Sequence, residues 1–221
     1  MLSFASPSWQ TSFVAKTTGN NGFLGSGQTR VASLIVPQLY LSDYWTAHDE
    51  KDILRLKVTH VVSVIDREPT LPDCIPAERR LRISITDRAS ANISEHLSQA
   101  TEFISAAINE SDKNCVLVHC FQGVSRSATV VCAYLVASTT MSSGEAIAFV
   151  QSKRAVVNPN PGFRRQLRQW AVDNHGEAPE KTGRVAKFAG GFAQTFREMK
   201  AIAGAQPVAP QPIPKRPASE A

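Results

Sequence analysis

A cysteine and an arginine near the middle of the chain have the spacing that a site for binding and attacking a phosphoryl group requires. Cys120 follows an apolar run, and Arg126 begins a run rich in Ala and Val, with five residues between the two. A loop of that length lets the backbone curl so that successive N–H groups point inward, and Gly123 can take the positive φ that such a curl needs. The second run predicts a helix, whose N-terminal end directs a partial positive charge at the same point.

These features predict which groups hold the phosphate and which group attacks it. A thiol in this positive field should have a pKa below the ordinary value of about 8.5, so Cys120 is the candidate nucleophile. Arg126 can donate two hydrogen bonds to two phosphoryl oxygens at once, a geometry that a lysine lacks. We refer to residues 120–126 as the cradle loop. Its predicted phosphate-binding residues are Phe121, Gln122, Gly123, Val124, Ser125 and Arg126.

The same stretch resembles a known family signature. The pattern His119-Cys-x-x-Gly-x-Ser-Arg-Ser127 is similar to that of the protein tyrosine phosphatase superfamily, and it looks like the dual-specificity branch, in particular its small, atypical type. The resemblance extends over about residues 39–170. The alternative, a structural cysteine beside a surface arginine, leaves the glycine, the two serines and the strand–loop–helix pattern unexplained.

The resemblance implies a reaction through a phosphocysteine, in which a general acid protonates the departing oxygen. Asp87 is the candidate acid, because it follows a β-rich run and precedes a helix, where the family places this residue. The alternative role for Asp87 is that of a loop or capping residue, and Asp66 is the second candidate for the acid. Ser127 is expected to donate a hydrogen bond to the sulfur and so to stabilise the thiolate when the phosphoenzyme breaks down.

Two further residues are expected to support the cradle loop. His119 is expected to orient the backbone around it and not to transfer protons. Asn160, in the stretch Asn158-Pro-Asn-Pro-Gly-Phe163, is expected either to hydrogen-bond the loop or to serve only in a turn. His60 fits a packed core histidine. The sequence contains no cluster of metal ligands, and neither a metal nor another cofactor is expected.

The elements that position these residues alternate between strand-like and helix-like patterns. The β-rich runs are Gln38–Leu41, Thr59–Ile65, Leu81–Ile85 and Cys115–His119. Helices are indicated over about Ser94–Glu110, after a capping box of Ser142 and Glu145, and along the stripe Phe163, Leu167, Trp170 and Ala171. This alternation predicts an α/β fold with a central, mostly parallel sheet flanked by helices, and a helical cluster after the active-site loop. The resemblance implies the same architecture, that of the protein tyrosine phosphatases.

The 221 residues are expected to hold one folded domain with an extension at each end. Residues 1–33 are expected to form a disordered extension. Their lack of acidic residues is also typical of a mitochondrial transit peptide, but Lys16 and Arg30 are their only basic residues. Residues 34–175 are expected to form the catalytic domain. Residues 176–221 combine a stripe of Phe side chains, which predicts either a docking helix or disorder, with a proline-rich tail.

The composition is that of an ordinary globular protein, and the net charge suits anionic partners. The chain is 43% hydrophobic and 19% charged, and its net charge of +5 suits phosphate groups without indicating nucleic acid, so no nucleic-acid partner is expected. Four cysteines without a Cys-x-x-Cys pair or zinc-finger spacing are typical of reduced thiols, which indicates the cytoplasm or the nucleus. The longest apolar stretches are too short to span a membrane.

The expected partner is a phosphorylated protein, in which phosphotyrosine and phosphoserine or phosphothreonine enter a shallow cleft. Phosphoinositide phosphatases of the same superfamily tend to carry lysines in the loop; this loop has none, although Arg79, Arg80 and Arg82 could supply charge. An RNA 5′-phosphatase is a further alternative, and so is a non-catalytic phosphate-binding adapter, which usually lacks the cysteine or the arginine. The sequence does not determine the oligomeric state or the physiological substrate.

Overall fold

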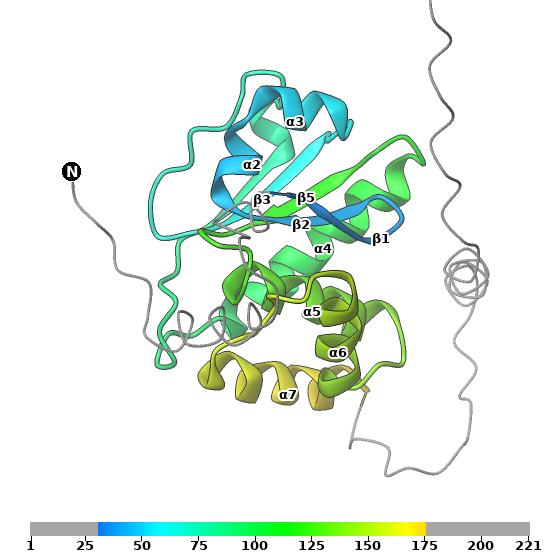
Figure 1. The fold of residues 1–221 in the computed structure, drawn as a ribbon. Helices are drawn as coiled ribbons and strands as arrows, with labels where there is room; N and C mark the ends of the chain where they lie inside the picture. The colour runs from blue at the N-terminus through cyan, green and yellow to red at the C-terminus, as the bar shows by residue number, and fades with distance from the viewer. Residues whose placement is uncertain (1–30, 176–221) are drawn as a thin grey trace, which may run out of the picture. The chain divides into compact units, whose positions relative to one another are not determined.

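Residues 31–175 are the part of the chain that the computed structural model describes, and within them five strands form one sheet (Figure 1). The strands are β1 (Ser33–Val36), β2 (Leu39–Ser42), β3 (His60–Val64), β4 (Arg80–Ile83) and β5 (Val116–His119), in the spatial order β1-β2-β5-β3-β4. Strands β2, β5, β3 and β4 run parallel, whereas β1 is antiparallel to β2. The predicted α/β fold with a central, mostly parallel sheet is confirmed.

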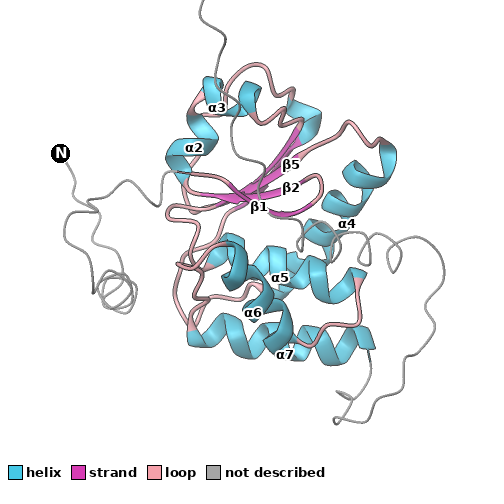
Figure 2. Cartoon of the chain, turned by 45° about the vertical axis from the view of Figure 1, so that its right-hand side comes forward, coloured by secondary structure: helices cyan, strands magenta, loops and turns pink. Residues whose placement is uncertain are grey.

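Helices cover both faces of this sheet (Figures 1 and 2). On one side lie α2 (Tyr44–His48) and α3 (Glu50–Arg55), and on the other lie α4 (Ser94–Glu110), α5 (Arg126–Ser138), α6 (Ser143–Lys153) and α7 (Pro161–His175). A 3₁₀ turn, η1 (Ala77–Arg79), precedes β4. Helix α5 is central to its layer, because it contacts α4, α6 and α7 as well as β5. The helical cluster predicted after the loop is therefore confirmed.

The longer helices lie where the sequence pattern predicts them. The helix expected over Ser94–Glu110 has those bounds and buries its apolar face. The capping box at the start of α6 is formed as well. The Ser142 hydroxyl accepts a hydrogen bond from the Glu145 amide at 3.3 Å, and the Glu145 carboxylate accepts one from the Ser142 amide at 2.8 Å.

The short elements β1, α2, α3 and η1 are not predicted by the sequence pattern. Each spans only three to six residues, too few for a periodicity to emerge. Single side chains define the starts of the two helices: Asp43 accepts a hydrogen bond from the Thr46 amide at 2.9 Å, and Asp49 accepts one from the Lys51 amide at 2.9 Å. A single aspartate of this kind also occurs in turns, so the sequence alone does not identify these helices.

Strand β5 leads to the candidate nucleophile. It lies between β2 and β3, and all its residues are buried. Leu117 packs in the core with Ala47 of α2 and Ile53 of α3. Successive side chains of a strand point to opposite faces, so Val116 and Val118 face the layer of α4 and α5. The strand ends at the sheet edge formed by the carboxyl ends of the parallel strands, which is where α/β proteins bind ligands.

Within the described residues, no helix is both long enough and apolar enough to cross a membrane. The predictions of a disordered or transit-peptide segment before residue 31, and of a docking helix and a proline-rich tail in residues 176–221, lie outside the described part of the chain. Strand β1 begins at Ser33, one residue before the predicted start of the catalytic domain.

Candidate active site

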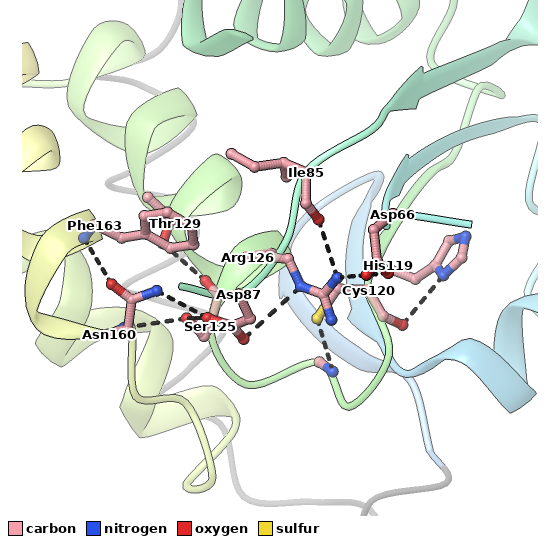
Figure 3. A network of polar contacts seen from close by, with 11 residues as sticks. Asp66, Ile85, Asp87, His119, Cys120, Ser125, Arg126, Thr129, Asn160 and Phe163 are labelled. Carbon is pink, nitrogen blue, oxygen red and sulfur yellow. Dashed lines mark hydrogen bonds and ion pairs between the residues drawn. The ribbon is translucent and has the colours of Figure 1, made fainter. Parts of the chain in front are cut away.

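The cradle loop connects the end of β5 to the start of α5, and its cysteine is almost completely buried (Figure 3). The backbone N–H of Gly123 donates a hydrogen bond to the Cys120 sulfur at 3.2 Å. Gly123 has the positive φ expected of it, 67°, and a Cβ atom there would lie 2.5 Å from the backbone oxygen of Ser42. Any other residue at this position would be strained and would collide with β2, so the shape of the loop depends on glycine.

The surroundings of the Cys120 sulfur favour its ionised form. Burial by itself raises the pKa of the thiol, but the Arg126 guanidinium and the nearby hydroxyl and backbone N–H of Ser127 lower it by more, so the pKa lies below its ordinary value. At the other two buried cysteines desolvation dominates. It raises the pKa of Cys115 to about 11 and also raises the pKa of Cys132. Of the buried thiols in residues 31–175, therefore, only Cys120 is activated.

Ser127, the second residue of α5, lies beside this sulfur. Its side chain is buried, and the hydroxyl lies near enough to the sulfur to lower the pKa of the Cys120 thiol. By strict geometry the hydroxyl oxygen has no hydrogen-bond partner among the described residues. A hydroxyl has one hydrogen to donate, and the expected bond from Ser127 to the sulfur therefore remains a prediction.

Arg126 lies at the mouth of the cradle loop with its guanidinium held by groups from two neighbouring loops. Its Nη1 donates to the Ile85 carbonyl at 3.1 Å and lies 3.4 Å from Oδ1 of Asp66. Its Nε lies 3.8 Å from Oδ2 of Asp87. Both candidate acids therefore lie beside the candidate phosphate clamp, and they differ in exposure: the side chain of Asp66 is 47% exposed and that of Asp87 is 7% exposed.

The two oxygens of the Asp87 carboxyl group face different partners. Oδ1 accepts hydrogen bonds from the Ser125 hydroxyl at 2.7 Å and from the Asn160 side chain at 2.8 Å, whereas Oδ2 faces Arg126 (Figure 3). One donor belongs to the cradle loop and the other to the loop before α7. The carboxyl group is therefore fixed relative to the nucleophile by elements far apart in the sequence.

Asn160 connects three parts of the site. Besides its bond to Asp87, its backbone N–H donates to the Ser125 hydroxyl at 3.1 Å, and its side-chain oxygen accepts from the Phe163 amide at 2.9 Å in the first turn of α7. The two roles that the sequence leaves open for this residue, bonding to the cradle loop and shaping a turn, are thus combined in one buried side chain.

His119 is buried and contacts the backbone of the nucleophile. Its Nε2 lies 2.7 Å from the Ser63 hydroxyl of β3, and its Nδ1 lies 3.4 Å from the Cys120 carbonyl. Burial, with smaller contributions from His48 and Arg126, lowers the pKa of His119 to about 3. The ring is therefore neutral near pH 7, as an orienting role requires. Ser63 is not predicted from the sequence, because a serine within a strand carries no distinguishing pattern.

Arg154 is a second buried arginine at the cradle loop, and the sequence does not predict its role. It follows α6 and is 5% exposed. Its Nε donates to the Gly123 carbonyl at 3.1 Å, and its Nη2 donates to the Gln122 carbonyl at 3.3 Å. In the sequence, this residue is one basic residue at the end of a helix, which is an ordinary surface position.

The other loop side chains lie on either side of this backbone. Val124 is buried. The ring of Phe121 is half-buried, and together with Trp45 and Arg67 it forms a group of side chains that we call the rim of the site. The Phe121 ring centroid lies 5.0 Å from that of Trp45 and 5.2 Å from Cζ of Arg67. Trp45 is 42% exposed, so this rim presents apolar surface next to the nucleophile. Among the described residues, no group of three or more His, Cys, Asp or Glu side chains is arranged to hold a metal ion.

Comparison with known families gives one match that covers most of this domain. A model of the dual specificity phosphatase catalytic domain matches residues 39–173. Among curated proteins, rat dual specificity protein phosphatase 15 is 40% identical over 153 residues, which are 68% of this chain and 60% of that protein. Mouse dual specificity protein phosphatase 22 is 34% identical over 175 residues, which are 74% of this chain and 90% of that protein. The chain thus spans 60% of the first relative and most of the second.

Solved structures have the same fold. A crystal structure of DUSP15 has a TM-score of 0.60 at 31% identity and covers 63% of this chain and 86% of that one. The human tyrosine phosphatase-like serine/threonine/tyrosine-interacting protein also has a TM-score of 0.60, at 29% identity, and covers 65% of this chain and 97% of that one.

Proposed function

The chain belongs to the dual specificity phosphatase family, and from that premise we propose that it hydrolyses phosphotyrosine and phosphoserine or phosphothreonine in proteins through a phosphocysteine intermediate. The observation that carries the proposal is the geometry of the cradle loop: the Gly123 N–H donates to the Cys120 sulfur at 3.2 Å, and α5 begins at Arg126. In keeping with this geometry, Cys120 is the buried cysteine of residues 31–175 whose thiol pKa is lowered. A thiolate next to a forked cation is what attack on a phosphate monoester requires.

In the first step the Cys120 thiolate attacks phosphorus while the bond from phosphorus to the substrate oxygen breaks. The inward-facing amides of the loop and the Arg126 guanidinium bind the equatorial oxygens. The Gly123 N–H already points at the sulfur and the Arg126 guanidinium is held by the Ile85 carbonyl, so these donors stabilise the transition state with little reorganisation. The electron pair of the broken bond remains on the leaving oxygen, which needs a proton.

We assign the supply of that proton to Asp87. Its Oδ1 is already bound by Ser125 and Asn160, so we assign the reacting proton to the other oxygen, Oδ2. A carboxyl group fixed on one side presents its other oxygen in a defined direction, and this positioning makes general acid catalysis efficient.

In the second step Asp87, now a carboxylate, takes a proton from water. The water oxygen attacks phosphorus, and the P–S bond breaks to return the Cys120 thiolate and inorganic phosphate. Ser127 stabilises that thiolate as it leaves. His119 stays neutral and orients the Cys120 backbone from β3, since its low pKa prevents it from carrying a proton near pH 7.

A phosphoinositide substrate is less well supported than a protein. Two of the three arginines that could meet extra phosphates are engaged elsewhere: Arg80 donates to the carbonyls of Ile75 and Pro72 at 2.7 and 3.0 Å, and Arg82 pairs with Glu68 at 2.7 Å. No feature of the described residues favours an RNA 5′-phosphate.

The adapter alternative needs a direct test, because one similar structure is named as an interacting protein and the fold is therefore compatible with binding. In this chain the cysteine and the arginine are both present, which favours turnover. The purified chain should hydrolyse para-nitrophenyl phosphate as well as matched phosphotyrosine and phosphothreonine peptides.

The Cys120→Ser variant should lose this activity at least about 10³-fold while keeping its fold and its affinity for phosphate, since the alcohol stays protonated where the thiol ionises. Circular dichroism and phosphate release measure the two properties. A wild-type chain that binds phosphopeptide without releasing phosphate would instead be an adapter, and a Cys120→Ser variant that keeps wild-type rates would remove the nucleophile assignment.

A further inference from the structure

The guanidinium of Arg154 and the sulfur of Cys120 lie on opposite sides of one peptide group. The carbonyl of Gln122 accepts a hydrogen bond from Arg154 Nη2 at 3.3 Å, and the N–H of the same peptide, which belongs to Gly123, donates to the sulfur at 3.2 Å. The C=O and N–H of a trans peptide point in opposite directions. A cation, a peptide and the nucleophile therefore form one continuous series of hydrogen bonds.

The next peptide of the loop is held by the same side chain. Arg154 Nε donates to the Gly123 carbonyl at 3.1 Å, so both carbonyls that flank this glycine are bound on the side away from the sulfur. A Cβ atom at Gly123 would lie 2.9 Å from Arg154 Nη2, which means that the guanidinium packs directly against the backbone. Because the C=O and N–H of one peptide point in opposite directions, binding these two carbonyls to the guanidinium keeps the N–H groups of Gly123 and Val124 directed toward the inside of the loop.

The guanidinium is also anchored outside the loop. Its Nη1 donates to the Val31 carbonyl at 2.7 Å and lies 3.4 Å from the Ser33 hydroxyl at the start of β1. The segment at the start of β1 therefore holds the Arg154 side chain in place, and Arg154 in turn holds the cradle loop.

Burying this charge has a free-energy cost, and a buried carboxylate partly offsets it. Burial lowers the pKa of Arg154, while the charges of Asp43 and Cys120 act to raise it. Asp43 is itself buried and caps α2. A hydrophobic side chain here would avoid this cost but would leave the carbonyls of Gln122, Gly123 and Val31 without this donor, so the charge holds the backbone of the loop as well as filling space.

We propose that Arg154 is a positioning residue of the phosphatase reaction, which holds and polarises the 122–123 peptide so that its N–H is directed at the Cys120 sulfur. A hydrogen bond from a cation to a carbonyl strengthens the N–H of the same peptide as a donor, and such series are cooperative. The role in phosphate binding rests on the proposed function, whereas the effect on the sulfur does not.

The test compares three full-length variants with the wild type. Arg154→Met removes the charge and the hydrogen-bond donors but keeps an unbranched apolar side chain, and Arg154→Lys keeps the charge without the fork. Arg80→Met is the matched control, because Arg80 also donates to two backbone carbonyls, those of Ile75 and Pro72. Arg80 is the first residue of β4, whereas the cradle loop follows the carboxyl end of the parallel strand β5. Alkylation of Cys120 by iodoacetamide is followed against pH by mass spectrometry, alongside thermal unfolding and kcat/KM on para-nitrophenyl phosphate.

The expected result for Arg154→Met is a rise of roughly 0.5–1 unit in the apparent pKa of Cys120 alkylation, because losing positive potential favours the neutral thiol. Apart from Arg154 itself, the charged and polar groups that act on the sulfur, Arg126, Asp87 and Ser127, are the same in every variant. The buried Asp43 beside Arg154 is unchanged as well, and His119 stays neutral over the pH range. kcat/KM should fall about ten- to a hundredfold as the loop amides lose their alignment. Arg154→Lys should lie between this variant and the wild type.

Arg80→Met should lower the unfolding temperature and leave the alkylation curve unchanged. An alkylation curve for Arg154→Met that coincides with that of the wild type would overturn the proposal and leave a purely structural role. If Arg154→Met does not fold, Arg154→Lys provides the test. An alkylation curve and a kcat/KM that both match the wild type in this variant would overturn the proposal. A wild-type chain that hydrolyses no phosphomonoester would remove the proposed function, while the alkylation curves would still decide whether Arg154 acts on the sulfur.

Discussion

At the scale of single residues, the Asp87 carboxyl group has two oxygens in two different environments. Oδ1 is bound by a serine of the cradle loop and by Asn160, and Oδ2 lies 3.8 Å from Arg126. Asp66 also lies beside that arginine, but its side chain is largely solvated. We assign the acid to Asp87 and not to Asp66, because the Asp87 side chain is buried and its hydrogen bonds fix the direction of its carboxyl group.

The Asp87→Ala variant should therefore lose more activity on a poor leaving group than on an activated one. Serine leaves a phosphopeptide as a strongly basic alkoxide, so the loss there should approach the ~10²–10⁴-fold that general acid catalysis is worth. The loss on para-nitrophenyl phosphate should be smaller, because its phenolate departs with little help. Steady-state kinetics on both substrates, with Asp66→Ala as the control, measure the difference. Equal losses on the two substrates would mean that the acid is another group.

The sulfur of Cys120 offers a second prediction at this scale. Its lowered pKa means that the thiolate persists as the pH falls below the ordinary thiol value of about 8.5, and alkylation should decline only below the lowered pKa. Cys115, whose pKa is raised to about 11, should stay unmodified near pH 7. Site-resolved mass spectrometry after iodoacetamide treatment measures both. A Cys120 that reacts no faster than an unfolded thiol at pH 6 would contradict the activation.

At the scale of elements, the site is assembled where the carboxyl end of β5, the start of α5 and the start of α7 meet. Helix α5 begins at Arg126 itself, so the clamp lies at a helix N-terminus, whose partial positive charge acts in the same direction. The start of α7 reaches the same place through Asn160, which is buried and bonded to Ser125, Asp87 and Phe163. The site therefore depends on how these elements dock and not only on their existence.

Two substitutions, one before α7 and one before α6, should distinguish the docking of a helix start at the site from the stability of a helix by itself. Asn160→Ala should lower the free energy of unfolding by about 1–3 kcal/mol, because buried groups lose their partners, and should also lower activity on phosphoserine peptides. Ser142→Ala, which removes the capping box of α6, should cost about 1 kcal/mol with activity unchanged. Urea unfolding and peptide kinetics on both variants make the comparison. Equal activity in the two variants would show that Asn160 only shapes a turn.

At the scale of the whole molecule, the sheet, the helices on both of its faces and every residue assigned to the site lie within residues 31–175. The family model matches residues 39–173 within that range. The fold and the chemistry are therefore expected to need nothing outside it.

A chain of residues 31–175 should fold and hydrolyse para-nitrophenyl phosphate at a rate within about threefold of the full chain, since it keeps the whole sheet, its helices and every residue assigned to the site. A chain that starts at residue 37 is the matched comparison, because it lacks β1 together with Val31 and Ser33, the anchors of Arg154. It should be less stable and less active. Loss of folding in the longer truncation would show that residues outside 31–175 contribute to the core.

The sequence by itself determined the fold class, the long helices and the cradle loop, because each of these is encoded locally. Helix Ser94–Glu110 follows from apolar spacing, α6 follows from its capping box, and the curl of the loop follows from Gly123 between Cys120 and Arg126. The short elements around β2 lack such a signal and were not predictable.

Only the tertiary structure decided which residues support that loop. Arg154 contacts the loop directly from 34 residues after Cys120, and Ser63 acts through His119 from 57 residues before Cys120. Each has an ordinary local sequence. Hydrogen bonds from a buried cation to backbone carbonyls depend on where those carbonyls point after the chain has folded, and no residue pattern records that direction. The same reason explains why Asp87 and Asp66, which are equivalent candidates by residue type, differ once burial and partners are known.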